Sequence, residues 1–256
     1  MEGKSVELLR KAGIEVIVGT LQDEARDLNR RFIINKEDTI PYITLKFAKS
    51  EDGYMGQVDK QVWLSNEQSK MLVHKWRSEY QAIMIATNTA IVDNPRLNTR
   101  LYPGASPLRI VIDRHNRIPA EHHVLSDELA TRVYTYQSNY PLTGSNKSSV
   151  VIPRDLDNEL VWIFEDLRKA GISTILVEGG QTLLKNIVKN ELWHDAYVIE
   201  TQKELKTGIK SPKISGKIYQ SRQLNDDNVL NIRSLRLINK LGRPMVKVPL
   251  TSVNSA

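Results

Sequence analysis

Short apolar runs recur along this chain and alternate with segments in which apolar residues have helical spacing. Four to eight consecutive apolar residues suit a strand that is buried on both faces of a sheet. On this basis we expect strands over residues 42–48, 82–86, 109–113, 133–136, 150–152, 174–177 and 195–200, with a shorter strand over residues 15–18.

The segments of helical spacing predict helices over residues 6–12, 22–31, 65–78, 160–170 and 182–189, and a single helical turn over residues 88–92. Ser65 followed by Gln68 has the spacing of a capping box, which predicts a helix start at Ser65. Residues 203–228 are rich in Lys, Ser, Gly and Asn, as is typical of a surface loop. Residues 229–239 and 244–248 are expected to pair as a hairpin.

The alternation of strands with helices predicts an α/β fold, in which helices flank a mostly parallel sheet that ends in an antiparallel C-terminal hairpin. The first 38 residues differ from the rest, because three short elements cannot close a core of their own. We therefore divide the chain into an appendage, residues 1–38, and a main domain, residues 39–256.

Composition narrows the class of protein. The 256 residues are 40% hydrophobic and 26% charged, which is ordinary for a globular protein. The sequence holds no cysteine, which excludes disulfides and cysteine-based zinc sites and is typical of a cytoplasmic protein. No run is long enough to span a membrane, and no H-x-x-x-H spacing predicts a metal site. The net charge of +6 suits a phosphorylated small molecule better than nucleic acid, because acidic residues are interspersed with the basic ones.

The most informative segment is residues 175–184, where an apolar run ends in Glu178 and turns through Gly179 and Gly180 into a helical pattern. Such a turn gathers free backbone N–H groups and the positive end of a helix dipole, a combination that suits phosphate. Glu178 would face the crevice in which open α/β sheets bind ligands. The alternative is an ordinary tight joint, and the segment lacks the G-x-G-x-x-G dinucleotide pattern.

An ordered series of short motifs resembles the reductase domain of the bifunctional deaminase–reductases of riboflavin biosynthesis, which has a dihydrofolate-reductase-like fold. The motifs are Pro41-Tyr42-Ile43-Thr44-Leu45-Lys46, Ser50-Glu51-Asp52-Gly53, Trp63-Leu64-Ser65, Ala86-Thr87-Asn88-Thr89, Asp93-Asn94-Pro95-Arg96-Leu97, Arg109-Ile110-Val111-Ile112-Asp113 and Val177-Glu178-Gly179-Gly180.

Residues 1–38 resemble the end of the deaminase domain and its connector in that family. The family's deaminase holds zinc with His and two Cys, and this sequence contains no Cys. Either the sequence is a piece of a longer protein or the deaminase is a separate chain, which would then be a candidate partner.

The resemblance implies a cytoplasmic homodimer that uses NADPH to reduce the ribosyl group of 5-amino-6-(5-phosphoribosylamino)uracil to the ribitylamino product. We expect no nucleic-acid or membrane partner. Two alternatives stay open: a non-catalytic nucleotide-binding partner of a separate deaminase, and a reductase of the same fold that acts on a pterin or folate.

The resemblance also implies a set of residues that bind the cofactor. It comprises Ala48, Trp63, Thr89, Asp93 and the turn-and-helix residues Gly180, Gln181, Thr182, Leu183, Leu184, Lys185 and Asn186. From the sequence alone, Ala48 and Trp63 would equally suit core packing, and Thr89 and Asp93 would suit helix capping. No acidic residue follows the turn at the spacing of an NAD-type ribose clamp, so the preference for NADPH is implied by the resemblance only.

The substrate-binding set implied by the resemblance is Gln61, Arg77, Leu97, Arg100 and Glu178. The guanidinium groups of Arg77 and Arg100 are the candidates for the substrate phosphate. Without the resemblance, Arg77 would be read as a solvated charge and Leu97 as core, and Gln61 replaces the family's usual Ser. Lys46 is the candidate for proton donation or charge stabilisation near the reacting carbon, because a charge on a buried strand is costly unless paired; the alternative is a surface position on an edge strand.

Overall fold

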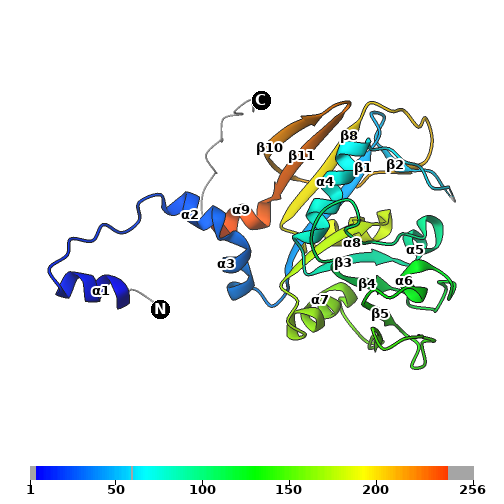
Figure 1. The fold of residues 1–256 in the computed structure, drawn as a ribbon, viewed down its shortest axis with the longest axis horizontal. Helices are drawn as coiled ribbons and strands as arrows, with labels where there is room; N and C mark the ends of the chain where they lie inside the picture. The colour runs from blue at the N-terminus through cyan, green and yellow to red at the C-terminus, as the bar shows by residue number, and fades with distance from the viewer. Residues whose placement is uncertain (1–3, 59, 242–256) are drawn as a thin grey trace.

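The computed structural model describes residues 4–58 and 60–241. Nine strands form one sheet in the order β10-β11-β8-β1-β7-β3-β4-β5-β6 (Figure 1). The strands from β8 to β6 are parallel to one another, and β11 is antiparallel to both of its neighbours, β8 and β10. Their bounds are β1 (Tyr42–Lys49), β3 (Ala82–Ala86), β4 (Leu108–Ile112), β5 (Thr131–Thr135), β6 (Lys147–Val151), β7 (Thr174–Gly179), β8 (Asp195–Thr201), β10 (Gly216–Leu224) and β11 (Asp227–Ser234).

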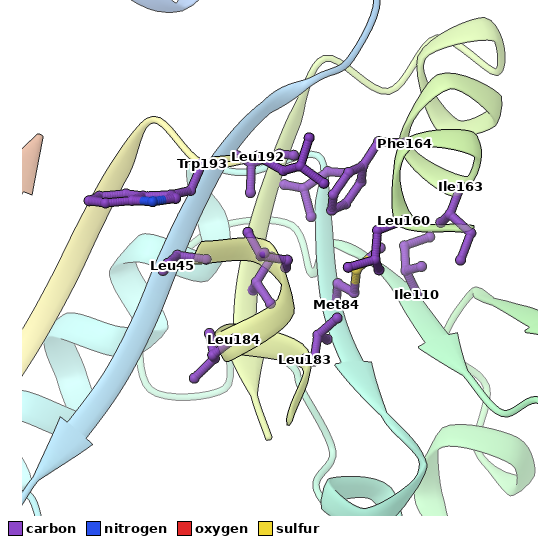
Figure 2. Packing of buried hydrophobic residues seen from close by; sticks show 14 of the residues in the cluster. Leu45, Met84, Ile110, Leu160, Ile163, Phe164, Leu183, Leu184, Leu192 and Trp193 are labelled. Atoms are coloured by element: carbon purple, nitrogen blue, oxygen red, sulfur yellow. The ribbon is translucent and has the colours of Figure 1, made fainter. Parts of the chain in front are cut away.

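Helices cover both faces of this sheet. One face packs against α7 (Glu159–Lys169) and α8 (Gln181–Lys189), whose apolar side chains meet the strands in the main core (Figure 2). The other face packs against α4 (Glu67–Ser78), α5 (Thr87–Asp93) and α6 (His123–Ser126). The predicted α/β class, with its mostly parallel sheet and antiparallel C-terminal strands, is confirmed.

The alternation of side chains along each strand explains the two covered faces. In β3, Ala82 and Met84 join the α7–α8 core, whereas Ile83 and Ile85 join the opposite cluster. Successive side chains of a strand point to opposite faces, so a strand that is buried on both sides must be apolar throughout. The short apolar runs of the sequence therefore marked the inner strands correctly.

The C-terminal hairpin lies earlier in the chain than predicted. Its strands are β10 and β11, so residues 216–224 are a strand and not part of a loop over residues 203–228. Ser234 ends β11, and its hydroxyl accepts a hydrogen bond from the Leu237 N–H (3.1 Å) at the start of α9 (Leu235–Leu241). This cap explains why residues 235–239 are helical and not extended. The second predicted strand, 244–248, lies outside the described residues.

Smaller differences also have local causes. Asn66 and not Ser65 caps α4, since its side chain accepts the Ser69 N–H (2.9 Å). Residues 15–18 form no strand, and the helix predicted over residues 22–31 is interrupted at Asn29. A two-stranded sheet of β2 (Tyr54–Gly56) and β9 (Ile209–Lys210) was not predicted, because strands this short have no recognisable period.

The N-terminal elements differ in how they meet the domain. Helix α1 (Lys4–Lys11) has no buried residue and extends away from the sheet (Figure 1). Helices α2 (Gln22–Leu28) and α3 (Arg30–Glu37) lie near α9 and β1 (Figure 1). Arg30 Nε lies 3.4 Å from the fully buried carboxylate of Asp195, and Ile34 is fully buried. Helix α3 is therefore packed into the domain, and α1 is not.

Candidate active site

The order of the strands determines where a ligand would bind. Strands β3 and β7 are neighbours, but the chain leaves β3 toward β4 and leaves β7 toward β8, in opposite lateral directions. Open α/β sheets bind ligands at such a switch point, beside the carboxyl ends of the strands. Leu45 of β1 pairs with Val177 of β7, and the next residues along the two strands are Lys46 and Glu178. The register therefore places these two side chains next to each other.

Glu178 is the centre of a buried charged cluster. Its carboxylate receives two hydrogen bonds from Arg77, one from Nε (2.8 Å) and one from Nη2 (2.7 Å). Lys46 Nζ lies 3.7 Å from the Oε2 atom of Glu178. The side chains of Arg77 and Lys46 are 11% and 17% exposed, respectively, and that of Glu178 is 7% exposed. The readings of Lys46 as an edge-strand residue and of Arg77 as a solvated charge are therefore wrong.

Burial and charge act against each other in this cluster. Burial favours the neutral carboxyl of Glu178, but the charges of Arg77 and Lys46 outweigh it and hold the pKa of Glu178 at about 2. Burial lowers the pKa of Lys46 below its usual value, and the charge of Glu178 opposes this shift. Burial also raises the pKa of Asp93, against the attraction of Lys46. Lys46 thus interacts with two carboxyl groups whose pKa values are shifted in opposite directions.

A group of cations adjoins the cluster. Arg77 donates from Nη1 to the Asn98 carbonyl (3.1 Å), and Arg100 donates from Nη1 to the Asn98 side chain (2.8 Å). Burial together with the charges of Arg77 and Arg96 lowers the pKa of Arg100, so these two guanidinium groups repel that of Arg100. Arg100 is exposed. An anion that bound here would relieve this repulsion, as a phosphate group would.

A cavity of about 460 Å³ opens beside the cluster, a volume in the range of small-molecule sites. Asp93 lies on its wall and links it to Lys46. The lining residues are Met55, Gly56, Gln57, Val58, Lys60, Val62, Ala86, Thr87, Asn88, Thr89, Val92, Asp93, Ile112, Arg114, Arg117, Leu160, Gly180, Gln181, Thr182, Leu183, Asn186 and Ile209.

The turn between β7 and α8 forms one wall of this cavity. Gly180 is the N-cap of α8, and no side chain there accepts from the first N–H groups of the helix. A Cβ atom at Gly180 would lie only 2.9 Å from Thr89 Oγ1, so a side chain would fill the space between the turn and α5. Free N–H groups at a helix start, beside a space that only glycine leaves open, suit the pyrophosphate of a nicotinamide dinucleotide.

Most of the predicted cofactor residues line the cavity, and four of them do not. Thr89, Asp93, Gly180, Gln181, Thr182, Leu183 and Asn186 line the cavity. Leu184 is fully buried in the core under α8 (Figure 2). Lys185 of the same helix is exposed. Ala48 packs against the sheet cluster on the α4 side. Trp63 is 57% exposed and lies under the ammonium of Lys70 at 4.8 Å, so the reading of Trp63 as a core residue is wrong.

The predicted substrate residues divide in a similar way. Arg77 and Glu178 are in direct contact, and Arg100 is beside Arg77. Gln61 is exposed and its Nε2 lies 3.4 Å from the Asp93 carbonyl, at the cavity rim. Leu97 is 2% exposed and packs in the cluster around Ile83 and Ile85.

Some lining residues were not predicted. Arg114 and Arg117 follow the carboxyl end of β4, and the rule that ligands bind at this edge of the sheet could have pointed to them. Met55, Gln57 and Val58 come from β2 and the segment after it. Nothing in their sequence pattern brings that segment to the cavity, because the contact depends on the pairing of β2 with β9.

Comparison with known proteins gives the family. Residues 41–199 match the family described as the RibD C-terminal domain. The chain belongs to this family. It is 33% identical over 212 residues to the riboflavin biosynthesis protein RibD of Aquifex aeolicus, a match that covers 82% of this chain and 60% of that protein. The chain thus spans about 60% of the length of this relative.

Two further relatives are informative. The 2,5-diamino-6-ribosylamino-4(3H)-pyrimidinone 5′-phosphate reductase of Methanothermobacter thermautotrophicus is 32% identical over 149 residues, 56% of this chain and 69% of that protein. Among solved structures, a diaminohydroxyphosphoribosylaminopyrimidine deaminase/5-amino-6-(5-phosphoribosylamino)uracil reductase of Thermotoga maritima superposes with a TM-score of 0.79 at 23% identity. That match covers 91% of this chain and 67% of the other, and it shows that the two share a fold.

Proposed function

We propose that this protein reduces the ribosyl group of 5-amino-6-(5-phosphoribosylamino)uracil to the ribitylamino product in riboflavin biosynthesis, with NADPH as the reductant. Its family and its relatives support a pyrimidine reductase, and the Thermotoga maritima protein is named for this substrate. The observation that carries the proposal is the Lys46–Glu178–Arg77 cluster beside the cavity under the glycine turn.

When bound, NADPH would supply the hydride that is added to the sugar carbon in the ring-opened form of the substrate. The residues of this chain have three tasks. Gly180 and the first N–H groups of α8 would hold the pyrophosphate. Arg100 and Arg77 hold the substrate phosphate.

Lys46 donates the proton that balances the added hydride. Its ammonium is buried near Asp93, a residue of the cavity wall, and burial lowers its pKa below the usual value of a lysine, which favours proton transfer. Glu178 keeps the ammonium charged between turnovers, because its own pKa of about 2 leaves it ionised.

The experiment compares Lys46→Met with Lys49→Met in the oxidation of NADPH. Lys49 is on the same strand, but it pairs with Glu200 and not with Glu178. We expect the Lys46 variant to bind NADPH and to turn over at least about a hundredfold more slowly. The Lys49 variant should retain full turnover. Equal turnover in the two variants would exclude Lys46 as the proton donor.

A further inference from the structure

His74 is a buried imidazole that the proposed reaction does not use. It lies on α4, three residues before Arg77, so the two side chains share one face of the helix. The residue is 4% exposed. Its Nδ1 atom is buried and has no hydrogen-bond partner among the described residues. A buried polar atom without a partner is costly, so its place beside Arg77 calls for an explanation.

A loop of the chain packs against this face of α4. A Cβ atom at Gly104 would lie only 2.6 Å from the Cβ atom of Ser78, which is four residues after His74 on the helix. The hydroxyl of Thr99 donates to the Gly104 carbonyl (3.0 Å), and Thr99 is 5% exposed. The loop of residues 98–104 is therefore held against the helix face on which His74 lies.

The charged groups that face His74 come from three parts of the chain. Arg77 lies on α4, Glu178 on β7 and Arg100 on the loop. Burial and the charges of the two arginines hold the pKa of His74 at about 4, against the opposite effects of Glu178 and of the Asn98 backbone. The imidazole is therefore neutral at pH 7 as long as no anion offsets the two arginines.

A phosphate group between the two arginines would reverse the field at His74. A phosphate monoester carries nearly two negative charges at pH 7, because its second pKa is about 6. These charges cancel the repulsion by Arg77 and Arg100 and attract a proton to the imidazole. The Nδ1 atom can take up this proton, because it makes no hydrogen bond within the described chain that protonation would break.

We propose that His74 takes up a proton when the phosphate group of the substrate binds at Arg77 and Arg100, so that binding of the phosphorylated ligand is coupled to proton uptake by the protein. This inference rests on the position of the substrate phosphate in the proposed function. The two arginines hold the anion, and His74 acts on it through its charge. A ligand without a phosphate does not bring the proton in, so His74 favours the phosphorylated substrate over its dephosphorylated form.

The first test counts protons. Calorimetry with ribose 5-phosphate, the phosphorylated end of the proposed substrate, is run at pH 6.5 in buffers that differ in ionisation enthalpy. An imidazole restored to its ordinary pKa of about 6.5 is half protonated at this pH, so the unmodified protein should take up about half a proton more than His74→Gln. His115→Gln is the matched control, because it removes an exposed histidine. This control should exchange as many protons as the unmodified protein.

The second test follows the imidazole itself by nuclear magnetic resonance. The sequence has five histidines, so their ring C–H resonances can be assigned by substitution. At pH 6.5, ribose 5-phosphate should move one of these resonances toward the position of a protonated imidazole. That resonance should be the one that is missing from His74→Gln. If this variant does not fold, as judged by circular dichroism, His74→Asn supplies the assignment.

Three results would overturn the inference: no binding of ribose 5-phosphate, equal proton uptake by the unmodified protein and a folded His74→Gln variant, or a shifted resonance that belongs to another histidine. The assays contain neither NADPH nor a pyrimidine, so a failure of the proposed reduction is seen separately. Normal reduction without uptake at His74 would overturn this inference alone. Uptake at His74 in a protein that reduces no pyrimidine would contradict the proposed function and leave the role of His74 established.

Discussion

At the scale of single residues, Glu178 controls the charge of the proposed site. It compensates two buried cations, Arg77 and Lys46, and its pKa of about 2 keeps it ionised at any pH at which the protein is used. The pKa of Glu178 in the folded protein lies below its value of about 4.3 in the unfolded chain. The ionised carboxylate therefore stabilises the folded protein at pH values above about 4.3. This stabilisation is lost as the pH falls toward 2.

Replacement of Glu178 by Gln should destabilise the protein by about 3 kcal/mol, because it leaves two buried cations without a counter-charge. The same change removes the carboxylate that favours the ammonium of Lys46, so its pKa should fall further. Turnover requires the protonated lysine and should therefore decline at a lower pH than in the unmodified enzyme. Urea unfolding and a pH–rate profile measure the two effects.

Glu200→Gln is the matched control for this prediction. Glu200 pairs with Lys49 (2.8 Å), but both side chains are about a third exposed. Loss of such a pair costs about 0–1 kcal/mol and should not move the pH profile. A profile that shifts equally in both variants would mean that Glu178 does not tune Lys46.

At the scale of elements, two segments lie at opposite ends of the sheet: the turn between β7 and α8, and the helix α3. The turn brings the helix start to the cavity, and α3 closes the opposite, amino-terminal end of β1. The sequence predicted the turn well, because a buried strand, two glycines and an amphipathic helix each have a clear local pattern.

Other elements could not be read from local patterns. Strand β10 is mostly exposed and lacks an apolar face, so only its pairing with β11 makes it a strand. In the same way, the burial of Lys46 and Arg77 depends on Glu178, which is more than a hundred residues away from each in the sequence. The resemblance named these residues, but their contacts required the fold.

Gly180→Val tests the turn. The new side chain would meet Thr89 Oγ1, since even its Cβ atom would lie 2.9 Å from that oxygen. We expect NADPH binding to weaken by at least about a hundredfold because the pyrophosphate loses its place, while circular dichroism remains native. Fluorescence titration with NADPH measures the affinity. If the folded variant bound NADPH as tightly as the unmodified protein, the pyrophosphate would have to lie elsewhere.

Two truncations test whether α3 belongs to the domain. Removal of residues 1–20 takes away α1, which buries nothing, and should leave the urea midpoint unchanged. Removal of residues 1–38 also deletes Arg30 and Ile34 and leaves the buried Asp195 with one cation fewer. We expect this truncation to lower the free energy of unfolding by at least about 3 kcal/mol. Equal midpoints for both truncations would show that the domain begins at residue 39, as the sequence division proposes.

At the scale of the whole molecule, one chain combines a sheet with a switch point, a cavity at its carboxyl edge and an N-terminal segment that lies outside the matched family region. No helix among the described residues is long and apolar enough to cross a membrane. The chain covers 60% of its Aquifex relative. The activity that we propose for this chain is the reduction alone.

The most direct test of this account is product analysis by chromatography and mass spectrometry after incubation with NADPH. With 5-amino-6-(5-phosphoribosylamino)uracil we predict a ribitylamino product that has gained two hydrogens, one molecule for each NADPH consumed. The unreduced 2,5-diaminopyrimidinone precursor should release no ammonia, and dihydrofolate should not react. Recovery of the unchanged uracil substrate from a folded protein that binds NADPH, or reduction of dihydrofolate in its place, would contradict the account.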